Sequence, residues 1–527
     1  MTLVTVTGRN GMVTAPHRLA AEAGLSVLRD GGNAIEASIA VAATLAVVYP
    51  HMTGIGGDGF WCIAEPDGRV HAIQGCGGAA GRADLALYEG HASVPVRGAL
   101  AANTVAGTLS AWAAALAEPG CTVPLDRLLR DAVAHAEAGV AVTAGGAAIA
   151  AAKGGELRAQ PGAYATVFEP EGRPLRRGDM LRQPLLAATL RLIADEGPDA
   201  FYRGALAGRV AADLAAVGSP VAAADLAAHR ATRMAPLRAR IGGIDLFNSP
   251  PPTQGLASLL ILALFDRLEA AMADRFDHVH GLVEATKQAF MLRDRHVGDP
   301  ASHTFDGQAL LDDSAALDDL AARIDPAVAL AWPQPPQWGD TCWFGAADGQ
   351  GRVVSAIQST YFEFGSGVVL PETGITWQNR GCSFRLAPDG WNCLRPARKP
   401  FHTLNPALAR FDDGRTMAYG TMGGEGQPQT QAALFTRYAR YGVDLQDAIS
   451  RPRWLLGRTW GDESTTLKIE DGFDDALYAE LAAAGHAVER VGAQTAVMGH
   501  AGAIVRHGDG RLEGATDPRS DGAVAAW

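Results

Sequence analysis

Residues 339–347 read Gly-Asp-Thr-Cys-Trp-Phe-Gly-Ala-Ala and place the hydroxyl of Thr341 at the start of a predicted strand. A proline-rich stretch at 332–338 precedes this segment and favours an extended loop. A turn-forming cluster at 348–351 and a second strand at 352–360, built mostly of β-branched, aromatic and small residues, follow it. The sequence therefore predicts a core β-hairpin that begins with a hydroxyl side chain beside a loop.

Thr341 has the position of a nucleophile that becomes an N-terminus when the chain is cut before it. A threonine hydroxyl is a weak nucleophile without an adjacent base, and a mid-chain amide nitrogen cannot act as one. Cleavage between Asp340 and Thr341 would release an α-amine, whose reference pKa of about 7.7–8.0 is close to operating pH. The pattern indicates a self-cleaving hydrolase, although a threonine that starts a strand is also common without any such role.

Length and charge narrow the class of protein. The chain has 527 residues, of which 48% are hydrophobic and 19% charged, as in globular proteins with a large core. A net charge of −12 argues against a nucleic-acid partner. The first residues lack a basic segment leading into an apolar run, and the longest apolar helix candidate, 34–48, is too short to span a bilayer. We expect a cytoplasmic protein that binds neither nucleic acid nor membrane.

The rest of the chain predicts mixed helices and strands. Helices are expected from Pro16 to about residue 30, at 33–49, through most of 125–232, at 256–271 and at 279–295. Strands are expected at 60–64 and 245–248, and the proline-rich segment 249–255 is expected to form a rigid loop. After residue 371, short strands alternate with glycine-rich turns.

Two apparent motifs do not carry the functions that their patterns suggest. Residues 54–59 match a dinucleotide-binding pattern, but they precede a predicted strand instead of following one and opening a helix. His278 and His280 have a spacing that can hold a metal in a strand, yet they begin a predicted helix and have no cysteine nearby. We expect neither a dinucleotide nor a metal at these positions.

Several segments together resemble the γ-glutamyltranspeptidase family of N-terminal nucleophile hydrolases, over nearly the whole chain. The resemblance rests on the segments 31–34, 56–60, 250–255, 284–287, 298–300, 339–341, 422–424 and 514–519. Their order and spacing are more specific than any one motif. The resemblance implies an α+β fold of the αββα sandwich type, built from a large chain, 1–340, and a small chain, 341–527.

The resemblance also implies catalytic roles. Thr341 would be nucleophile and base, and Ser359 stands where the family has a second threonine that hydrogen-bonds the nucleophile. Gly423 and Gly424 match paired glycines whose backbone N–H groups form the oxyanion hole, where a side chain would block the tetrahedral intermediate.

The positions that hold the γ-glutamyl group in the family differ in this chain. They read Tyr361, Arg380, Ser383, His402 and Thr403. An arginine in place of an acidic group would repel the substrate ammonium by up to about 4 kcal/mol at 4 Å and an effective dielectric of 20, and would attract a carboxylate equally. A guanidinium also binds carboxylates bidentately. These changes favour a small anionic amide over glutathione.

Within the family, the altered positions are most similar to those of members that release ammonia from oxamate in purine breakdown. Arg82 aligns loosely with an N-terminal arginine that binds the substrate carboxylate. The alternatives are a γ-glutamyltransferase or glutathione hydrolase, a glutaryl acylase of the cephalosporin type and, remotely, a binding protein that stays uncut. The expected mechanism needs no metal or organic cofactor. The two subunits from one precursor could pair further into a dimer of heterodimers.

Overall fold

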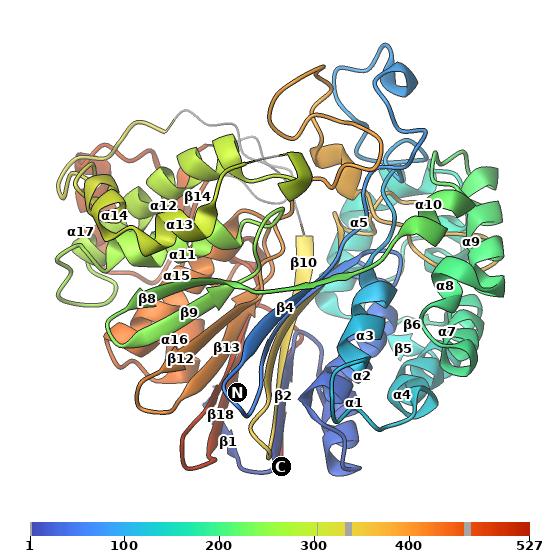
Figure 1. Ribbon diagram of the computed structural model, residues 1–527, viewed down its shortest axis with the longest axis horizontal. Helices are drawn as coiled ribbons and strands as arrows, with labels where there is room; N and C mark the ends of the chain where they lie inside the picture. Colours follow the sequence, from blue (N-terminus) through green and yellow to red (C-terminus); the bar gives the residue numbers. More distant parts are fainter. Residues whose placement is uncertain (1–2, 303, 333–339, 458–464) are drawn as a thin grey trace.

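The protein is an αββα sandwich in this computed structural model, which describes residues 3–302, 304–332, 340–457 and 465–527 (Figure 1). Two seven-stranded antiparallel sheets form its inner layers. The first has the order β19 (Ala523–Ala526), β2 (Gly11–Ala15), β10 (Asp340–Asp348), β11 (Val353–Tyr361), β3 (Asp58–Ala64), β4 (Val70–Gly75) and β7 (Thr232–Met234). The second has the order β1 (Val6–Gly8), β18 (Leu512–Thr516), β17 (Ala501–Arg506), β13 (Thr416–Thr421), β12 (Ala407–Phe411), β9 (Ile244–Asn248) and β8 (Leu237–Ile241).

Helices cover the outer face of each sheet, at the right and left of Figure 1. The layer on the first sheet contains α1 (Arg18–Arg29), α2 (Ala34–Val48), α3 (Thr108–Leu116), α4 (Leu125–Ala138), α5 (Ala144–Arg158), α6 (Tyr164–Phe168), α7 (Pro184–Glu196), α8 (Ala200–Arg203), α9 (Ala205–Ala216) and α10 (Ala223–Ala228). The layer on the second contains α11 (Gly255–Phe265), α12 (Phe276–His296), α13 (Gly307–Asp312), α14 (Ser314–Ala321), α15 (Gly426–Phe435), α16 (Leu445–Ser450) and α17 (Asp475–Ala483). Two smaller sheets pair β5 (Val140–Ala141) with β6 (Met180–Leu181), and β14 (Trp454–Leu456) with β15 (Leu467–Glu470) and β16 (Val488–Val491).

Three apolar clusters explain the layers. One lies between the first helical layer and its sheet, and a second lies between the other helices and the second sheet. The third fills the space between the sheets and includes Phe60, Trp343, Ile357, Leu408 and Ile504. Strand β11 is buried along its whole length because both of its faces pack against apolar layers. The predicted αββα sandwich is confirmed.

The early helices and the central hairpin form where the sequence predicts them. Asn33 caps α2: its side chain accepts from the amides of Ile35 (2.9 Å) and Glu36 (3.1 Å), and the Glu36 carboxylate accepts from the amide of Asn33 (2.8 Å). The 340–361 hairpin pairs antiparallel as expected. No described helix is long and apolar enough to cross a bilayer.

Other predicted elements need correction. Pro16 lies before α1, whose N-cap is His17, and α11 ends at Phe265, earlier than residue 271. The region after residue 371 contains helices α15, α16 and α17 as well as strands and turns. Every residue of α15 is buried, so the helix has no apolar stripe, and Pro428 stands in its first turn. A helix buried on all sides lacks the periodicity that predicts helices from sequence.

Candidate active site

Thr341 is the second residue of β10, and its side chain is buried. Its Oγ1 donates to Ser359 Oγ on β11 (3.5 Å) and accepts from Gln427 Nε2 in the first turn of α15 (3.4 Å). The pairing of β10 with β11 shifts between Asp340 and Cys342, directly at the threonine. Tyr361, opposite Asp340, has φ 83°, a left-handed conformation that side chains rarely adopt. Such irregularities occur often beside active sites.

Gly423 and Gly424 connect β13 to α15 with φ values of 118° and 54°. Both values lie where glycine is favoured. Both glycines are buried, and among the described residues none accepts a hydrogen bond from either amide. Buried amides without a partner are uncommon in folded proteins. This turn leads directly to Gln427, which contacts Thr341, so the two N–H groups are suited to stabilise a developing oxyanion.

Gln254 hydrogen-bonds both the glycine turn at 423–424 and the segment that contains Thr403. Its Nε2 donates to the carbonyls of Gly424 (2.8 Å) and Thr403 (2.8 Å). Its Oε1 accepts from Arg293 Nη1 (3.0 Å), and Arg293 Nη2 donates to Glu425 (2.9 Å). The proline-rich loop before α11 therefore fixes the position of the oxyanion turn.

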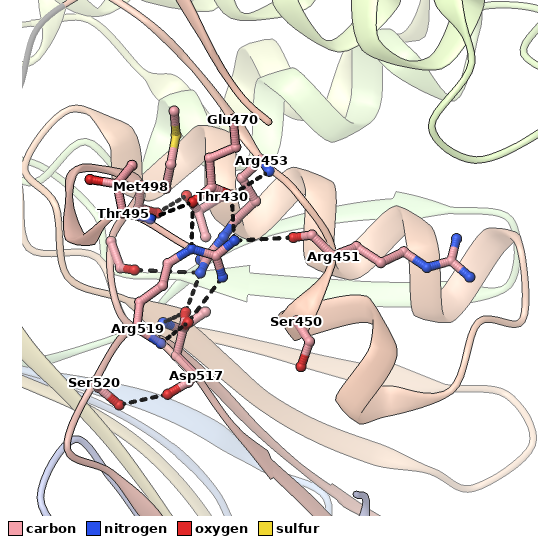
Figure 2. A network of polar contacts seen from close by, with 12 residues as sticks. Thr430, Ser450, Arg451, Arg453, Glu470, Thr495, Met498, Asp517, Arg519 and Ser520 are labelled. Carbon is pink, nitrogen blue, oxygen red and sulfur yellow. Dashed lines mark hydrogen bonds and ion pairs between the residues drawn. The ribbon is translucent and has the colours of Figure 1, made fainter. Parts of the chain in front are cut away.

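Figure 2 shows a buried network of charges formed by Arg453, Glu470, Asp517 and Arg519. Arg519 donates to Glu470 Oε1 (2.8 Å) and Asp517 Oδ1 (3.0 Å), and Arg453 also pairs with Asp517. All four side chains are almost fully buried, so each charge depends on its partners. Burial lowers the pKa of Arg453 to about 10. The network joins the motif at 514–519 to strands β14 and β15.

The network reaches the oxyanion turn through one short segment. Asp517 Oδ2 accepts from the amide of Ala501 (2.7 Å), and Arg453 Nη2 donates to the carbonyl of Gly499 (3.4 Å). The carbonyl of His500 accepts from the amide of Met422, the residue before Gly423 (3.3 Å). The buried ions thus help to position the turn through residues 499–501.

Arg380, in a short 3-10 helix (Arg380–Ser383), is buried beside the Tyr361 ring. Its guanidinium carbon lies 3.6 Å from the ring centroid, and Nη1 donates to Thr403 Oγ1 (3.4 Å). Its Nε and Nη2 have no hydrogen-bond partner in the part of the chain that the structure describes. Tyr361 N in turn donates to Ser359 Oγ (2.8 Å), which links the arginine to the nucleophile. A buried guanidinium with two unused donors is suited to hold an anion.

Asp58 and His402 adjoin this arginine. Asp58 Oδ1 accepts from Gly107 N (3.0 Å) and Gln378 Nε2 (3.1 Å), and Oδ2 lies 3.3 Å from His402 Nε2. Burial raises the pKa of Asp58 to about 7 against the opposing charge of Arg380. Burial, followed by the charge of Arg380, lowers the pKa of His402 well below its ordinary value. The pocket is therefore cationic below about pH 7, because His402 and Asp58 are then both neutral.

The structure brings together most of the predicted site residues. One chain of contacts joins Thr341, Ser359, Tyr361, Arg380 and Thr403. His402 is adjacent to Thr403 in sequence. Ser383 lies close to the same segment, because its Oγ donates to the Phe401 carbonyl (3.4 Å).

Arg82 is not part of this group. Its side chain is exposed, and its Nε donates to the Pro220 carbonyl (3.1 Å). Within the described residues, no recorded contact joins it to the nucleophile or to Arg380. The sequence suggested Arg82 only through a loose alignment, and the structure places its side chain on the surface. Arg82 is therefore not part of the proposed site.

Sequence reasoning missed three residues of the site. Asp58 lies in the glycine-rich segment 56–60 and Gln254 in the proline-rich segment 250–255. Membership of these motifs was the only sequence signal for a role of either residue. Gln427 carries no such signal, because its contact with Thr341 depends on the unexpected helix α15.

A sandwich of two antiparallel sheets with a buried threonine at the start of a central strand defines an N-terminal nucleophile hydrolase. The gamma-glutamyltranspeptidase family model matches residues 20–527, and the chain belongs to this family of amidohydrolases.

Relatives and solved structures agree with this assignment. The chain is 54% identical to an oxamate amidohydrolase proenzyme of Klebsiella pneumoniae, with 98% of both sequences covered. It is 40% identical to a glutathione hydrolase-like proenzyme of Bacillus subtilis, with 99% of both covered. A crystal structure of a cephalosporin acylase from Bacillus halodurans matches with a TM-score of 0.92 at 33% identity, covering 100% of this chain and 97% of that one.

Proposed function

We propose that this protein cuts itself before Thr341 and then hydrolyses oxamate to oxalate and ammonia. The observation that carries the proposal is Arg380, a buried guanidinium with two N–H groups that no described residue uses, joined to the nucleophile through Tyr361 and Ser359. The 54% identical relative bears the name of an oxamate amidohydrolase proenzyme, which supports the same substrate. The products of the cut would be chains 1–340 and 341–527.

The proposed reaction is an acyl transfer through Thr341. The threonine Oγ attacks the amide carbon of oxamate while its α-amine takes the hydroxyl proton. The amides of Gly423 and Gly424 donate to the oxyanion, the C–N bond breaks, and the amine returns the proton to the departing ammonia. Water, activated by the same amine, then attacks the oxalyl ester and releases oxalate.

We expect the spacing between carboxylate and amide in the substrate to decide which substrate Arg380 can hold for attack by Thr341. In oxamate the carboxylate is one bond from the carbon under attack, so an arginine close to the threonine can hold it. A glutaryl or γ-glutamyl group places three carbons between its carboxylate and its amide. The γ-glutamyl group also carries an ammonium, which Arg380 repels. Tyr361, His402 and Thr403 would shape the pocket around the guanidinium.

A substrate panel tests the proposal. The processed enzyme is given oxamate, a γ-glutamyl anilide and a glutaryl anilide at equal concentrations, and release of ammonia or aniline is measured. We expect oxamate to be preferred by roughly a hundredfold or more in kcat/KM, because the other substrates leave Arg380 unpaired or repelled. Cleavage of the glutaryl anilide without ammonia release from oxamate would contradict the proposal and favour an acylase.

Ser359→Ala is expected to slow oxamate turnover by roughly tenfold, the effect of one lost hydrogen bond to the nucleophile. Ser359→Thr keeps the hydroxyl and serves as the matched control, with near wild-type kcat. Steady-state ammonia release by both variants is the measurement. Equal rates for the alanine and threonine variants would remove Ser359 from the proposed mechanism.

The KM for oxamate is expected to rise by about tenfold between about pH 6 and about pH 8. Asp58, with a pKa of about 7, is neutral below this range and negative above it. Its negative charge then competes with the substrate carboxylate for Arg380. Asp58→Asn should abolish this rise in KM, whereas kcat in both proteins should still follow the α-amine. Parallel KM profiles in the two proteins would show that Asp58 does not titrate beside the substrate.

The cytoplasmic location and the assembly of two cleaved pairs stay predictions. Size-exclusion chromatography with light scattering on the processed enzyme tests the second of them.

A further inference from the structure

A second cluster of chemically active side chains lies at the other end of β3. Glu65 directly follows that strand, His71 lies on β4 opposite Ile63, and Glu118 follows α3. The three side chains are more than nine-tenths buried, with exposed fractions of 7%, 6% and 4%. One ligand atom from each lies within 4.8 Å of the other two. The cluster is therefore compact enough to surround a single ion.

Four polar atoms of this cluster lack a hydrogen-bond partner among the described residues. These atoms are Glu65 Oε1, both ring nitrogens of His71 and Glu118 Oε2; all are buried and make no hydrogen bond to any residue that the structure describes. Leaving buried polar atoms unsatisfied is costly, so such a concentration calls for a ligand. His71 Nε2 and Glu118 Oε1 are 3.2 Å apart without hydrogen-bond geometry.

Two arginines orient the carboxylates and leave oxygens available. Arg352 donates to Glu65 Oε2 from Nε (2.9 Å), and its Nη2 lies 2.8 Å from the same oxygen. Arg233 Nη1 lies 3.1 Å from Glu118 Oε1, and the Arg233 side chain is half exposed, so its charge stays hydrated. Each carboxylate thus has one oxygen held by an arginine and one without a partner. Partners of this kind fix the ligands of metal sites.

We propose that Glu65, His71 and Glu118 bind one divalent transition-metal ion of the zinc type. Imidazole and carboxylate ligands together suit zinc and cobalt(II) better than calcium or magnesium. The seven residue steps from Asp58 to Glu65 span about 23 Å along an extended strand. The ion would brace the β3–β4 hairpin against the end of α3, away from Thr341.

Another histidine cluster offers a control within the same chain. His280 Nδ1 lies 2.9 Å from His486 Nε2, and Glu284 is held by Lys287 Nζ (2.6 Å). His278, the other histidine noted in the sequence, instead contacts Thr436 (2.8 Å). The group of His280, Glu284 and His486 is also compact, but its ring nitrogens pair with each other and the Lys287 ammonium already pairs with Glu284. We therefore expect no metal there.

Cobalt(II) titration tests the proposal. Untagged, chelator-treated wild type is titrated with cobalt(II) chloride, and visible absorption is recorded before and after addition of zinc chloride. We expect one equivalent of cobalt(II) with d–d bands that zinc abolishes. His71→Asn should weaken binding by about a hundredfold, and Glu118→Gln should weaken it as well. His486→Asn should bind as the wild type does.

Several outcomes would overturn the metal site. The proposal fails if the wild type shows no saturable cobalt(II) binding, or if His71→Asn binds cobalt(II) with unchanged affinity. The contact between His71 and Glu118 would then be a buried structural pair. Loss of binding in His486→Asn would move the ion to the other cluster. Circular dichroism shows whether each variant is folded. If the His71 and Glu118 variants do not fold, thermal unfolding of the wild type decides: zinc should raise the midpoint by a few degrees, and equal midpoints in chelator and zinc contradict the site.

Discussion

Thr341→Ala is expected to give a single uncut chain with no measurable amidase activity. The alanine has no hydroxyl to attack the carbonyl of residue 340, so the precursor cannot cleave itself and the α-amine base never forms. Loss of nucleophile and base together should lower kcat by at least about 10⁴-fold. Denaturing intact-mass measurement gives the processing state, and ammonia release from oxamate gives the activity.

Thr341→Ser is the matched control for this prediction. Serine keeps the hydroxyl and the future amine but lacks the methyl group that restricts the side-chain rotamers. It should therefore still produce chains 1–340 and 341–527, more slowly than threonine does. Two chains from the alanine variant, or a wild-type junction elsewhere than between residues 340 and 341, would refute the assignment of the nucleophile.

The parts of the fold that the sequence predicts well are those set by local chemistry. The 340–361 hairpin has strand-forming residues on both sides of a turn cluster, and Asn33 with Glu36 forms a complete capping box. Helix α15 has neither signal. Its ten residues are all buried, so its position follows from packing between α11 and β13, which no local pattern contains.

The site residues also differ in whether local sequence or tertiary packing brings them together. Thr341 and Ser359 are on paired strands of one hairpin, so the predicted hairpin already brings them near each other. The contact of Gln427 with Thr341 and that of Asp58 with His402 join segments far apart in sequence. Only tertiary packing creates those pairs. The same packing leaves Arg82 on the surface and buries Arg380 beside Tyr361.

Arg380→Met is expected to lower kcat/KM for oxamate by about 10²–10³-fold without preventing self-cleavage. Methionine removes a charge-assisted, bidentate grip on the substrate carboxylate, an effect of about 3–4 kcal/mol. Arg380→Lys keeps the charge but loses the planar fork, so its loss should be smaller, about tenfold. Ammonia release at varied oxamate measures both losses, and intact mass confirms processing. Unchanged kcat/KM in the methionine variant would place the substrate carboxylate elsewhere.

Stability distinguishes a substrate-binding Arg380 from a structural one. Removing one partner of a buried ion pair costs about 3–5 kcal/mol because the other charge is left uncompensated. No described carboxylate lies within ion-pair distance of Arg380, and burial lowers the pKa of its guanidinium, so keeping this side chain charged costs stability. Arg380→Met should then be at least as stable as the wild type toward urea while losing activity. A charge kept for substrate binding lowers the stability of the folded protein. A marked loss of stability in Arg380→Met would instead identify Arg380 as a structural ion.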